Sequence, residues 1–320
     1  MLLRRFGKCI LLIGPMILVA SAASGQNYPN KPIRIVTTGA GGGGDFTARL
    51  IAQGITGALG QTLVVDARPS GVIPGEIVAK APPDGYTLLV TAGTLWTLPL
   101  MQKTPYDPVR DFLPVTLAVS VPVVLVVHPS VAANSVKELI ALAKAKPGML
   151  NYAADSIGGV AHLAAELFNS MAAVNIVRVS YTSGSNRLAA SLRGEVQVQF
   201  MNQGLAAPHV KSGKLKVLAV TSAEPSALAP GVPTMTASGL PGYEVAGLVG
   251  MFAPAKTPAP IITRLNQEAV RFLKTTEAKE RFLGIGAETV GNSPEQFAAI
   301  IKADMARLGK VIKDAGIRVD

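Results

Sequence analysis

Apolar residues along this chain gather in short runs that alternate with longer segments of helical periodicity. The short runs are rich in β-branched residues and are bounded by turn-forming residues, which predicts strands at 33–37, 62–65, 87–91, 123–127, 150–153, 176–179, 196–200 and 215–220. Most of these runs are apolar throughout, as strands buried on both faces are. The alternation of strands and helices predicts an α/β fold with mostly parallel sheets.

The helical segments carry recognisable start and stop signals. Residues 45–59 and 159–171 place apolar side chains at helical spacing. Segment 135–148 opens with the spacing of a capping box and closes on Pro-Gly. Segment 293–312 opens with Ser-Pro and a Gln three positions after the Ser, which predicts a long C-terminal helix.

The 320 residues exceed what a single hydrophobic core usually organises. Two proline-punctuated extended stretches, 117–129 and 243–254, are predicted to cross between two domains. Domain 1 is then discontinuous, with residues 26–122 and 248–320, and domain 2 is a central insertion of residues 123–247. A ligand cleft is expected between the domains, where strand ends and helix starts converge.

The N-terminus has the three-part layout of a secretory signal peptide, predicted over residues 1–25. Three cations, Arg4, Arg5 and Lys8, precede an apolar run that is shorter than a membrane span, is broken by Gly-Pro and ends in small residues. We expect cleavage after Ala22 or a few residues later, and export to the periplasm. The single cysteine, Cys9, leaves with this peptide, so disulfides and cysteine nucleophiles are excluded in the mature chain.

Composition narrows the classes of function further. The formal net charge is +10, but the basic residues are dispersed and there is one Trp, so we expect mild attraction for anions and no nucleic-acid partner. The three histidines, His128, His162 and His209, lack metal-ligand spacing, which predicts no metal site. The GxSxG motif of serine hydrolases is absent.

The first predicted strand leads into a glycine-rich loop, TTGAGGGGD, and then a helix. Glycines allow backbone N–H groups to approach a ligand, and a helix start favours an anion. An alternative is a dinucleotide-binding oxidoreductase, since Gly39, Gly41 and Gly44 fit GxGxxG and Asp66 follows the next strand. Export and the lack of a catalytic set disfavour this alternative.

Motifs spread over the whole mature chain, in order, resemble the Bug family, the extracytoplasmic receptors similar to the substrate-binding subunit of tripartite tricarboxylate transporters. The most specific are AKAPPDGYTLLV and TPYDPVRDF, followed by SVKELIALAKAKPGMLNYA, APHVKSGKLKVLAVTS and GLPGYEV. The resemblance implies a two-domain, Venus-flytrap periplasmic binding protein that is not an enzyme, needs no cofactor and holds a small carboxylated solute. It also implies delivery to membrane permease subunits or, alternatively, to a sensor. We expect a monomer.

The resemblance also implies which residues contact the ligand. The implied contacts are, in domain 1, Gly42, Gly43, Gly44, Asp45, Thr91, Ala92, Gly93 and Thr94, and, in domain 2, Asp155, Ser156, Gly158, Tyr181, Thr182 and Asn202. Asp45 has the alternative role of a helix cap, and Tyr181 that of a packed side chain. Ser156 and Gly158 precede a helix, so two helix starts are expected to hold the anion.

Two departures from the family pattern fall in this implied site. The glycine-rich loop of the family often reads PPGGATD, where this chain has AGGGGD. After the second-domain strand the family often has YKG, where this chain has YTS at residues 181–183. A lysine contact is therefore absent, and the identity of the ligand does not carry over from the family.

Overall fold

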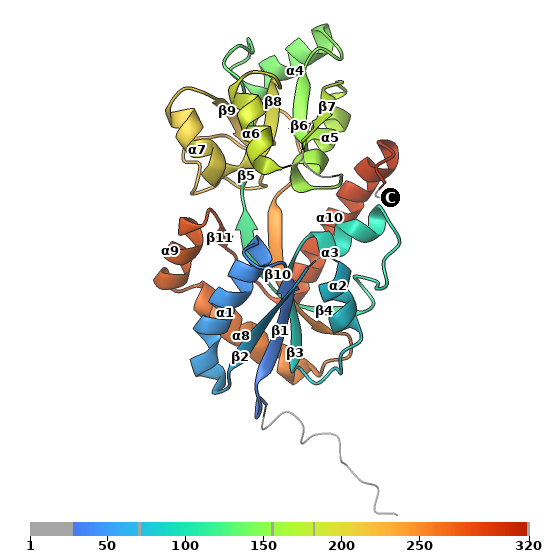
Figure 1. Ribbon diagram of the computed structural model, residues 1–320, viewed down its shortest axis with the longest axis vertical. Helices are drawn as coiled ribbons and strands as arrows, with labels where there is room; N and C mark the ends of the chain where they lie inside the picture. Colours follow the sequence, from blue (N-terminus) through green and yellow to red (C-terminus); the bar gives the residue numbers. More distant parts are fainter. Residues whose placement is uncertain (1–27, 70–71, 155–156, 182, 319–320) are drawn as a thin grey trace, which may run out of the picture.

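The strands form two separate sheets, one in each lobe of the computed structural model (Figure 1), which describes residues 28–69, 72–154, 157–181 and 183–318. The predicted signal peptide lies outside the described residues. The first sheet contains β1 (Ile33–Thr38), β2 (Leu63–Arg68), β3 (Thr87–Ala92), β4 (Phe112–Val121), β10 (Gly247–Pro254) and β11 (Glu288–Thr289). The second contains β5 (Val123–Val127), β6 (Asn151–Ala154), β7 (Val177–Ser180), β8 (Val198–Asn202) and β9 (Lys216–Val220).

Both sheets are mixed rather than mostly parallel. Their strand orders are β11-β4-β10-β3-β1-β2 and β7-β6-β8-β5-β9. Strand β1 pairs in parallel with β2 and β3, and β6 pairs in parallel with β7 and β8. The antiparallel pairs involve β4, β5 and β10, the strands next to the crossings between lobes. A strand that enters a sheet from the other lobe does not follow the βαβ connection that makes neighbours parallel.

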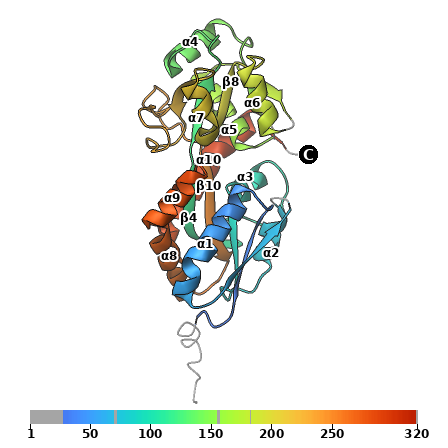
Figure 2. The same cartoon turned by 60° about the vertical axis from the view of Figure 1, so that its left-hand side comes forward.

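Helices cover both faces of the first sheet (Figure 2). They are α1 (Gly43–Leu59), α2 (Val72–Ala79), α3 (Thr94–Thr97), the 3-10 helix at Leu98–Leu100, α8 (Ala259–Leu273), α9 (Thr276–Gly284) and α10 (Pro294–Asp314). One core packs α1, α8 and α9 against the sheet and contains Ile35. The opposite core contains the adjacent Val36 with residues of α2, α3 and α10. Burial on both faces explains why these strands are apolar throughout.

The second lobe has the same layered construction with α4 (Val136–Ala145), α5 (Val160–Ala172), α6 (Gly184–Leu192) and α7 (Gln203–Lys211). Its main core includes Phe168 of α5 and Phe200 of β8, whose ring centroids are 6.1 Å apart. Helix α4 begins as predicted, because Ser135 accepts a hydrogen bond from the Glu138 N–H at 3.2 Å.

Three segments connect the lobes. Strand β4 passes through Pro122 into β5, residues 221–246 return to β10, and α10 extends from the first lobe toward the second (Figure 1). The start of α10 packs with Trp96 through Phe297, whereas Leu308 and Ile312 near its end belong to the main core of the second lobe. The division at 122/123 and 247/248 remains a prediction, but the C-terminal helix contributes side chains to both cores.

All eight predicted strands are present, with small shifts of their ends. Of the extended stretches predicted as crossings, 117–129 contains the end of β4 and all of β5, and 243–254 contains all of β10. Each crossing is therefore also part of a sheet. Among the described residues, no helix is both long and apolar enough to traverse a bilayer.

Candidate functional site

The glycine-rich loop joins the end of β1 to α1, which begins two residues earlier than predicted. Gly42 is the N-cap residue, and Gly42 and Gly43 are exposed. Gly44 is buried, and a Cβ atom there would lie 2.7 Å from Thr38 Oγ1 and 3.1 Å from Thr37 Oγ1. Only glycine fits this position, because the helix start packs directly onto its own strand. Gly42 and Gly43 are therefore the accessible part of the loop.

Asp45 fixes this loop rather than capping its helix. Its side chain is 5 % exposed, and Oδ2 accepts hydrogen bonds from the Gly41 N–H at 3.0 Å and from Arg49 Nε at 3.1 Å. Burial by itself raises the pKa of this carboxyl, but the bonds from Arg49 and Gly41 outweigh it and hold the pKa below its usual value. Asp45 is thus a charged residue in the first turn, and its predicted contact with a ligand stays a prediction.

The loop after β3 is tied to the crossing strand β10. The Gly93 N–H donates to the Leu248 carbonyl at 2.9 Å, and Gly93 in turn accepts bonds from the N–H groups of Trp96 and Thr97. Thr91 is buried, whereas Ala92, Gly93 and Thr94 line a cavity of about 70 Å³ between the lobes. The structure therefore brings three of the four residues predicted here to an interlobe cavity.

The second-lobe wall of that cavity includes Gly158. Gly158 has a φ of +71°, and a Cβ atom there would lie 2.3 Å from the Met101 sulfur of the first lobe. Its N–H donates to His162 Nδ1 at 3.0 Å, so this predicted donor is already engaged. Asp155, Ser156 and Thr182, also predicted to contact the ligand, lie outside the described residues.

His162 is held neutral by its surroundings. Burial, with a further contribution from Arg178, lowers the pKa of the imidazole to about 4. A neutral ring with an unprotonated Nδ1 accepts the Gly158 N–H and fixes the turn that leads into α5. His162 is therefore a positioning residue beneath the loop.

A second cavity, of about 220 Å³, opens at the start of α5. Its wall contains Gly159, Val160 and Ala161 from the helix start, Asn202 from the end of β8, and Arg187 from α6. The N–H groups in the first turn of a helix have no partner within the helix, so this wall presents donors and a cation together. Asn202 was predicted to contact the ligand, and the structure places it here.

Arg187 was missed by the sequence analysis. The YTS departure indicated a lost lysine, whereas a cation stands a few residues later, in the first turns of the helix that follows. The sequence feature that could have identified Arg187 is an arginine near the start of a helix that follows a strand, within the predicted binding region. Tyr181, by contrast, packs against the small core of Ala153, Ala190 and Val196, which agrees with the packed-side-chain alternative.

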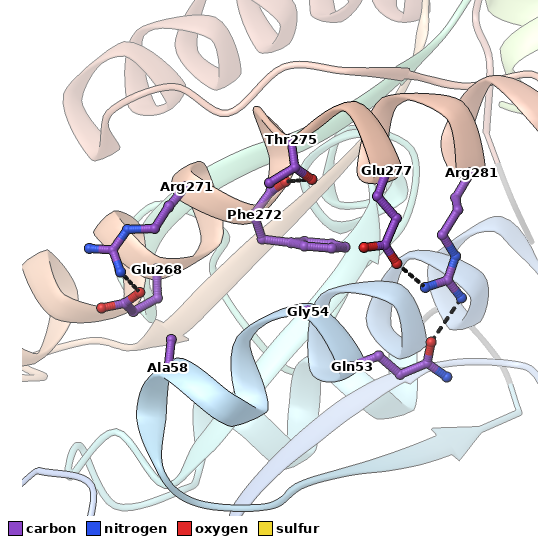
Figure 3. A pocket seen from close by; sticks show the side chains of 9 residues that line it. All are labelled: Gln53, Gly54, Ala58, Glu268, Arg271, Phe272, Thr275, Glu277 and Arg281. Carbon is purple, nitrogen blue, oxygen red and sulfur yellow. Dashed lines mark hydrogen bonds and ion pairs between the residues drawn. The ribbon is translucent and has the colours of Figure 1, made fainter.

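A larger groove of about 340 Å³ lies elsewhere in the first lobe, between α1 and the α8–α9 pair (Figure 3). Arg271 Nη1 is 2.8 Å from Glu268 Oε2, and Arg281 donates to Gln53 Oε1 at 2.8 Å and lies 3.5 Å from Glu277. None of the predicted ligand residues that the structure describes lines it. Because its charged side chains pair with one another, we interpret the groove as a contact between packed helices and not as a ligand site.

The acidic residue of the dinucleotide alternative is also paired. Asp66 Oδ2 accepts from Arg34 Nε at 2.9 Å, and Oδ1 lies 2.9 Å from Arg68 Nε. Both carboxylate oxygens therefore serve ion pairs within the first sheet. Within the described ranges, no group of three or more His, Cys, Asp or Glu side chains is placed to hold a metal ion.

Comparisons with known proteins agree with this architecture. The family model described as "Tripartite tricarboxylate transporter family receptor" matches residues 47–317. The protein BugT of Bordetella pertussis is 33% identical over 321 residues, which cover 98% of each chain. The likeness predicted from the sequence motifs is thereby confirmed.

Solved structures show the same fold. R. palustris Rpa4515 with adipate is 34% identical, with a TM-score of 0.73 over 91% of this chain and 99% of that one. The periplasmic binding protein BugD is 31% identical, with a TM-score of 0.69 over 91% and 99%. MatC (Rpa3494) from Rhodopseudomonas palustris with bound malate is 28% identical, with a TM-score of 0.69 over 89% and 100%. The predicted two-domain binding-protein fold is confirmed.

Proposed function

Because this chain belongs to the tripartite tricarboxylate transporter receptor family, we propose that it captures a small organic anion, a mono- or dicarboxylate, between its two lobes. A single observation carries the proposal, namely the cavity of about 220 Å³ where the first turn of α5, Arg187 and Asn202 converge. A helix start and a guanidinium are both favourable surroundings for a carboxylate. The carboxylates named with the two related structures, adipate and malate, give independent support.

A buried carboxylate requires several donors, because an uncompensated charge in a protein interior is costly. The first-turn N–H groups of α5 supply some of them, and the Asn202 side-chain amide and the Arg187 guanidinium supply others. The exposed glycines Gly42 and Gly43 offer a further helix start in the first lobe. We infer that these donors surround the anion when the lobes close.

Closure of the two lobes around the ligand is the conformational change by which a partner distinguishes the loaded receptor from the empty one. The lobes are joined at Pro122, at the segment before Gly247 and through α10, so rotation about these links changes the width of the cleft. A ligand that contacts both lobes shifts the equilibrium toward the closed form by its differential affinity. The closed receptor then presents its solute to membrane permease subunits, and the protein itself performs no chemistry.

The N-terminal layout supports export of the mature chain to the periplasm. We propose that it acts there as a monomer. A sensory or scavenging receptor that never meets a permease is the alternative, and it differs in its partner rather than in its site. Co-purification with membrane proteins from the native host distinguishes the two: retention of a multi-spanning permease supports transport.

Native mass spectrometry of the purified mature chain tests the binding function. We expect a co-purified mass of a small organic acid, which is lost after unfolding, dialysis and refolding. Thermal melting of the refolded protein with a panel of organic acids should then show stabilisation by some of them. Stabilisation by NAD and by no organic acid would reverse the proposal in favour of the dinucleotide alternative.

A further inference from the structure

We propose that the solute of this receptor is a monocarboxylate with a compact hydrocarbon body, because two cavities of opposite character meet at Val160. This inference rests on the proposed function and specifies the class of anion. Val160, the first residue of α5, lines both the cavity of about 220 Å³ and the cavity of about 70 Å³. Because Val160 is shared by the two cavities, we infer that a ligand bound in the first cavity extends past Val160 into the second.

The first cavity suits the carboxylate head. Arg187 brings a positive charge, Asn202 brings an amide, and Gly159 to Ala161 bring the donor end of α5. Among the lining residues that the structure describes, none has a carboxylate side chain. A single anionic group is the chemistry that these walls complement.

The second cavity suits a hydrocarbon group. Most of its side chains are aliphatic, and they come from both lobes and from the segment that crosses between them: Ala92, Val160, Leu163, Val245, Leu248 and Leu308. An apolar group placed among them is removed from water, which stabilises the complex. The volume of about 70 Å³ limits that group to a few carbon atoms.

Asp304 opposes a second carboxylate in this cavity. Its side chain lines the wall, and the residue is 8 % exposed. One oxygen accepts from Trp96 Nε1 at 2.7 Å and the other from Arg307 Nη2 at 2.9 Å. Both oxygens are thus engaged within the protein, and Arg307 is shared between Asp304 and Glu244. A ligand carboxylate here would therefore face Asp304 and aliphatic walls, with no cation among the described lining residues. A dicarboxylate fits this pair of cavities less well than a monocarboxylate of the same length.

Isothermal titration of the refolded mature chain with acids of matched length tests this inference. We expect hexanoate to bind more tightly than adipate, and butyrate more tightly than succinate or malate. Affinity should rise from acetate through propionate to butyrate by about fourfold per added methylene, the value expected for a buried CH₂. Tighter binding of the dicarboxylate in both pairs would overturn the inference and leave the proposed function standing. If no acid of either kind binds, the proposed function itself fails.

The Val160→Ser variant locates the boundary between the two cavities. Val160 is 39% exposed, so the change should leave the fold intact, and Val177→Ser, at 40% exposed on β7, is a matched control. We expect Val160→Ser to weaken butyrate binding about fourfold and acetate binding by less, because only butyrate has a hydrocarbon body that reaches past this side chain. Val177→Ser should change neither. Equal weakening of acetate and butyrate by Val160→Ser would contradict the division into head and body sites.

The fluorescence of Trp96 supplies a separate readout. It is the only tryptophan, and it lines the apolar cavity and not the polar one. Butyrate at saturation should therefore shift its emission, and acetate at saturation should shift it less. An identical response to both acids would place the hydrocarbon body outside this cavity and overturn the inference.

Discussion

Trp96 and Asp304, which are 208 residues apart in the chain, are joined by a buried hydrogen bond of 2.7 Å from the indole Nε1 to the carboxylate. Asp304 also accepts from Arg307, whose other nitrogen donates to Glu244 at 2.9 Å. Glu244 lies in the segment that returns from the second lobe to β10. The network thus links the loop after β3, the C-terminal helix and an interlobe crossing.

Replacing Asp304 tests the energetic importance of this network. Asp304→Asn keeps the size of the side chain but removes the charge paired with Arg307, so we expect unfolding in urea to become easier by about 1 to 3 kcal/mol. The intrinsic fluorescence of Trp96 follows the transition. Asp314→Asn, which breaks the exposed pair with Lys310 in the same helix, is the control and should change the free energy by less than about 1 kcal/mol. Equal effects of the two variants would contradict the assigned role of Asp304.

Two glycines of α1 should respond in opposite directions to alanine. A Cβ atom at Gly54 would lie 2.2 Å from the Phe272 ring, so Gly54→Ala overpacks the contact between α1 and α8 and should destabilise the protein by about 1 to 3 kcal/mol. At Gly57 nothing lies within 4 Å, so Gly57→Ala should stabilise by about 0.5 to 1 kcal/mol through helix propensity. Thermal melts of both variants give the comparison. Loss of stability in Gly57→Ala would show that the helix packs differently there.

Mild acid should destabilise the protein through His162. Its pKa is lowered to about 4 in the folded state, against 6.5 for an unperturbed imidazole. Between these values the unfolded state binds more protons than the native state, so stability is complete above pH 6.5 and falls as the pH drops toward 4. The loss from this group is about 3 kcal/mol. Urea titrations across this pH range should show a shallower decline for His162→Gln.

An NMR titration of the imidazole provides the direct check. The His162 ring should remain neutral at pH 5.5, which lies above its pKa of about 4. Protonation of His162 near pH 6.5 would contradict the assigned burial and its hydrogen bond with Gly158.

Arg187 should be the side chain whose removal most weakens anion binding. Arg187→Gln removes the charge in the polar cavity while retaining an amide, and a hydrogen bond to a charged group contributes about 1.5 to 3 kcal/mol, so affinity should fall at least tenfold. Arg193→Gln, at the end of the same helix, removes a cation that pairs with Glu195 and should leave affinity unchanged. Calorimetric titration with the acid of highest affinity measures both. Unchanged binding in Arg187→Gln would move the carboxylate out of this cavity.

The strands could be predicted well because burial on both faces leaves an uninterrupted apolar run, as in Val123–Val127. Several helices were not predicted. Helix α7 has weak periodicity, since it contains Pro208 and has few buried residues, whereas α8 was missed although its apolar residues recur at helical spacing. Whether neighbouring strands run parallel or antiparallel also could not be predicted from the sequence. Whether β10 runs parallel or antiparallel depends on where the chain re-enters the sheet, and no local pattern records that.

The site was predictable where it depends on the backbone and not where it depends on side chains from distant segments. Asn202 and the start of α5 follow strand ends, and this placement brings them together at one edge of the sheet. Gly44 illustrates the limit. This glycine was predicted to contact a ligand, but the absence of a side chain there is required by the close approach of Thr37 and Thr38 of its own strand. The role of Asp304 could not be predicted from the sequence, because only folding brings α10 beside Trp96.

The position of helix α10 late in the chain affects the order in which the protein can fold during synthesis. The side chains that complete both cores, Phe297 for one lobe and Leu308 for the other, belong to a helix that is synthesised after the strands of both sheets. Neither lobe can bury its interior fully until those residues have emerged, even though the N-terminal strands are made much earlier. A chain truncated before Ser293 would therefore leave two hydrophobic interiors open at once, which makes the incomplete product a ready target for proteolysis.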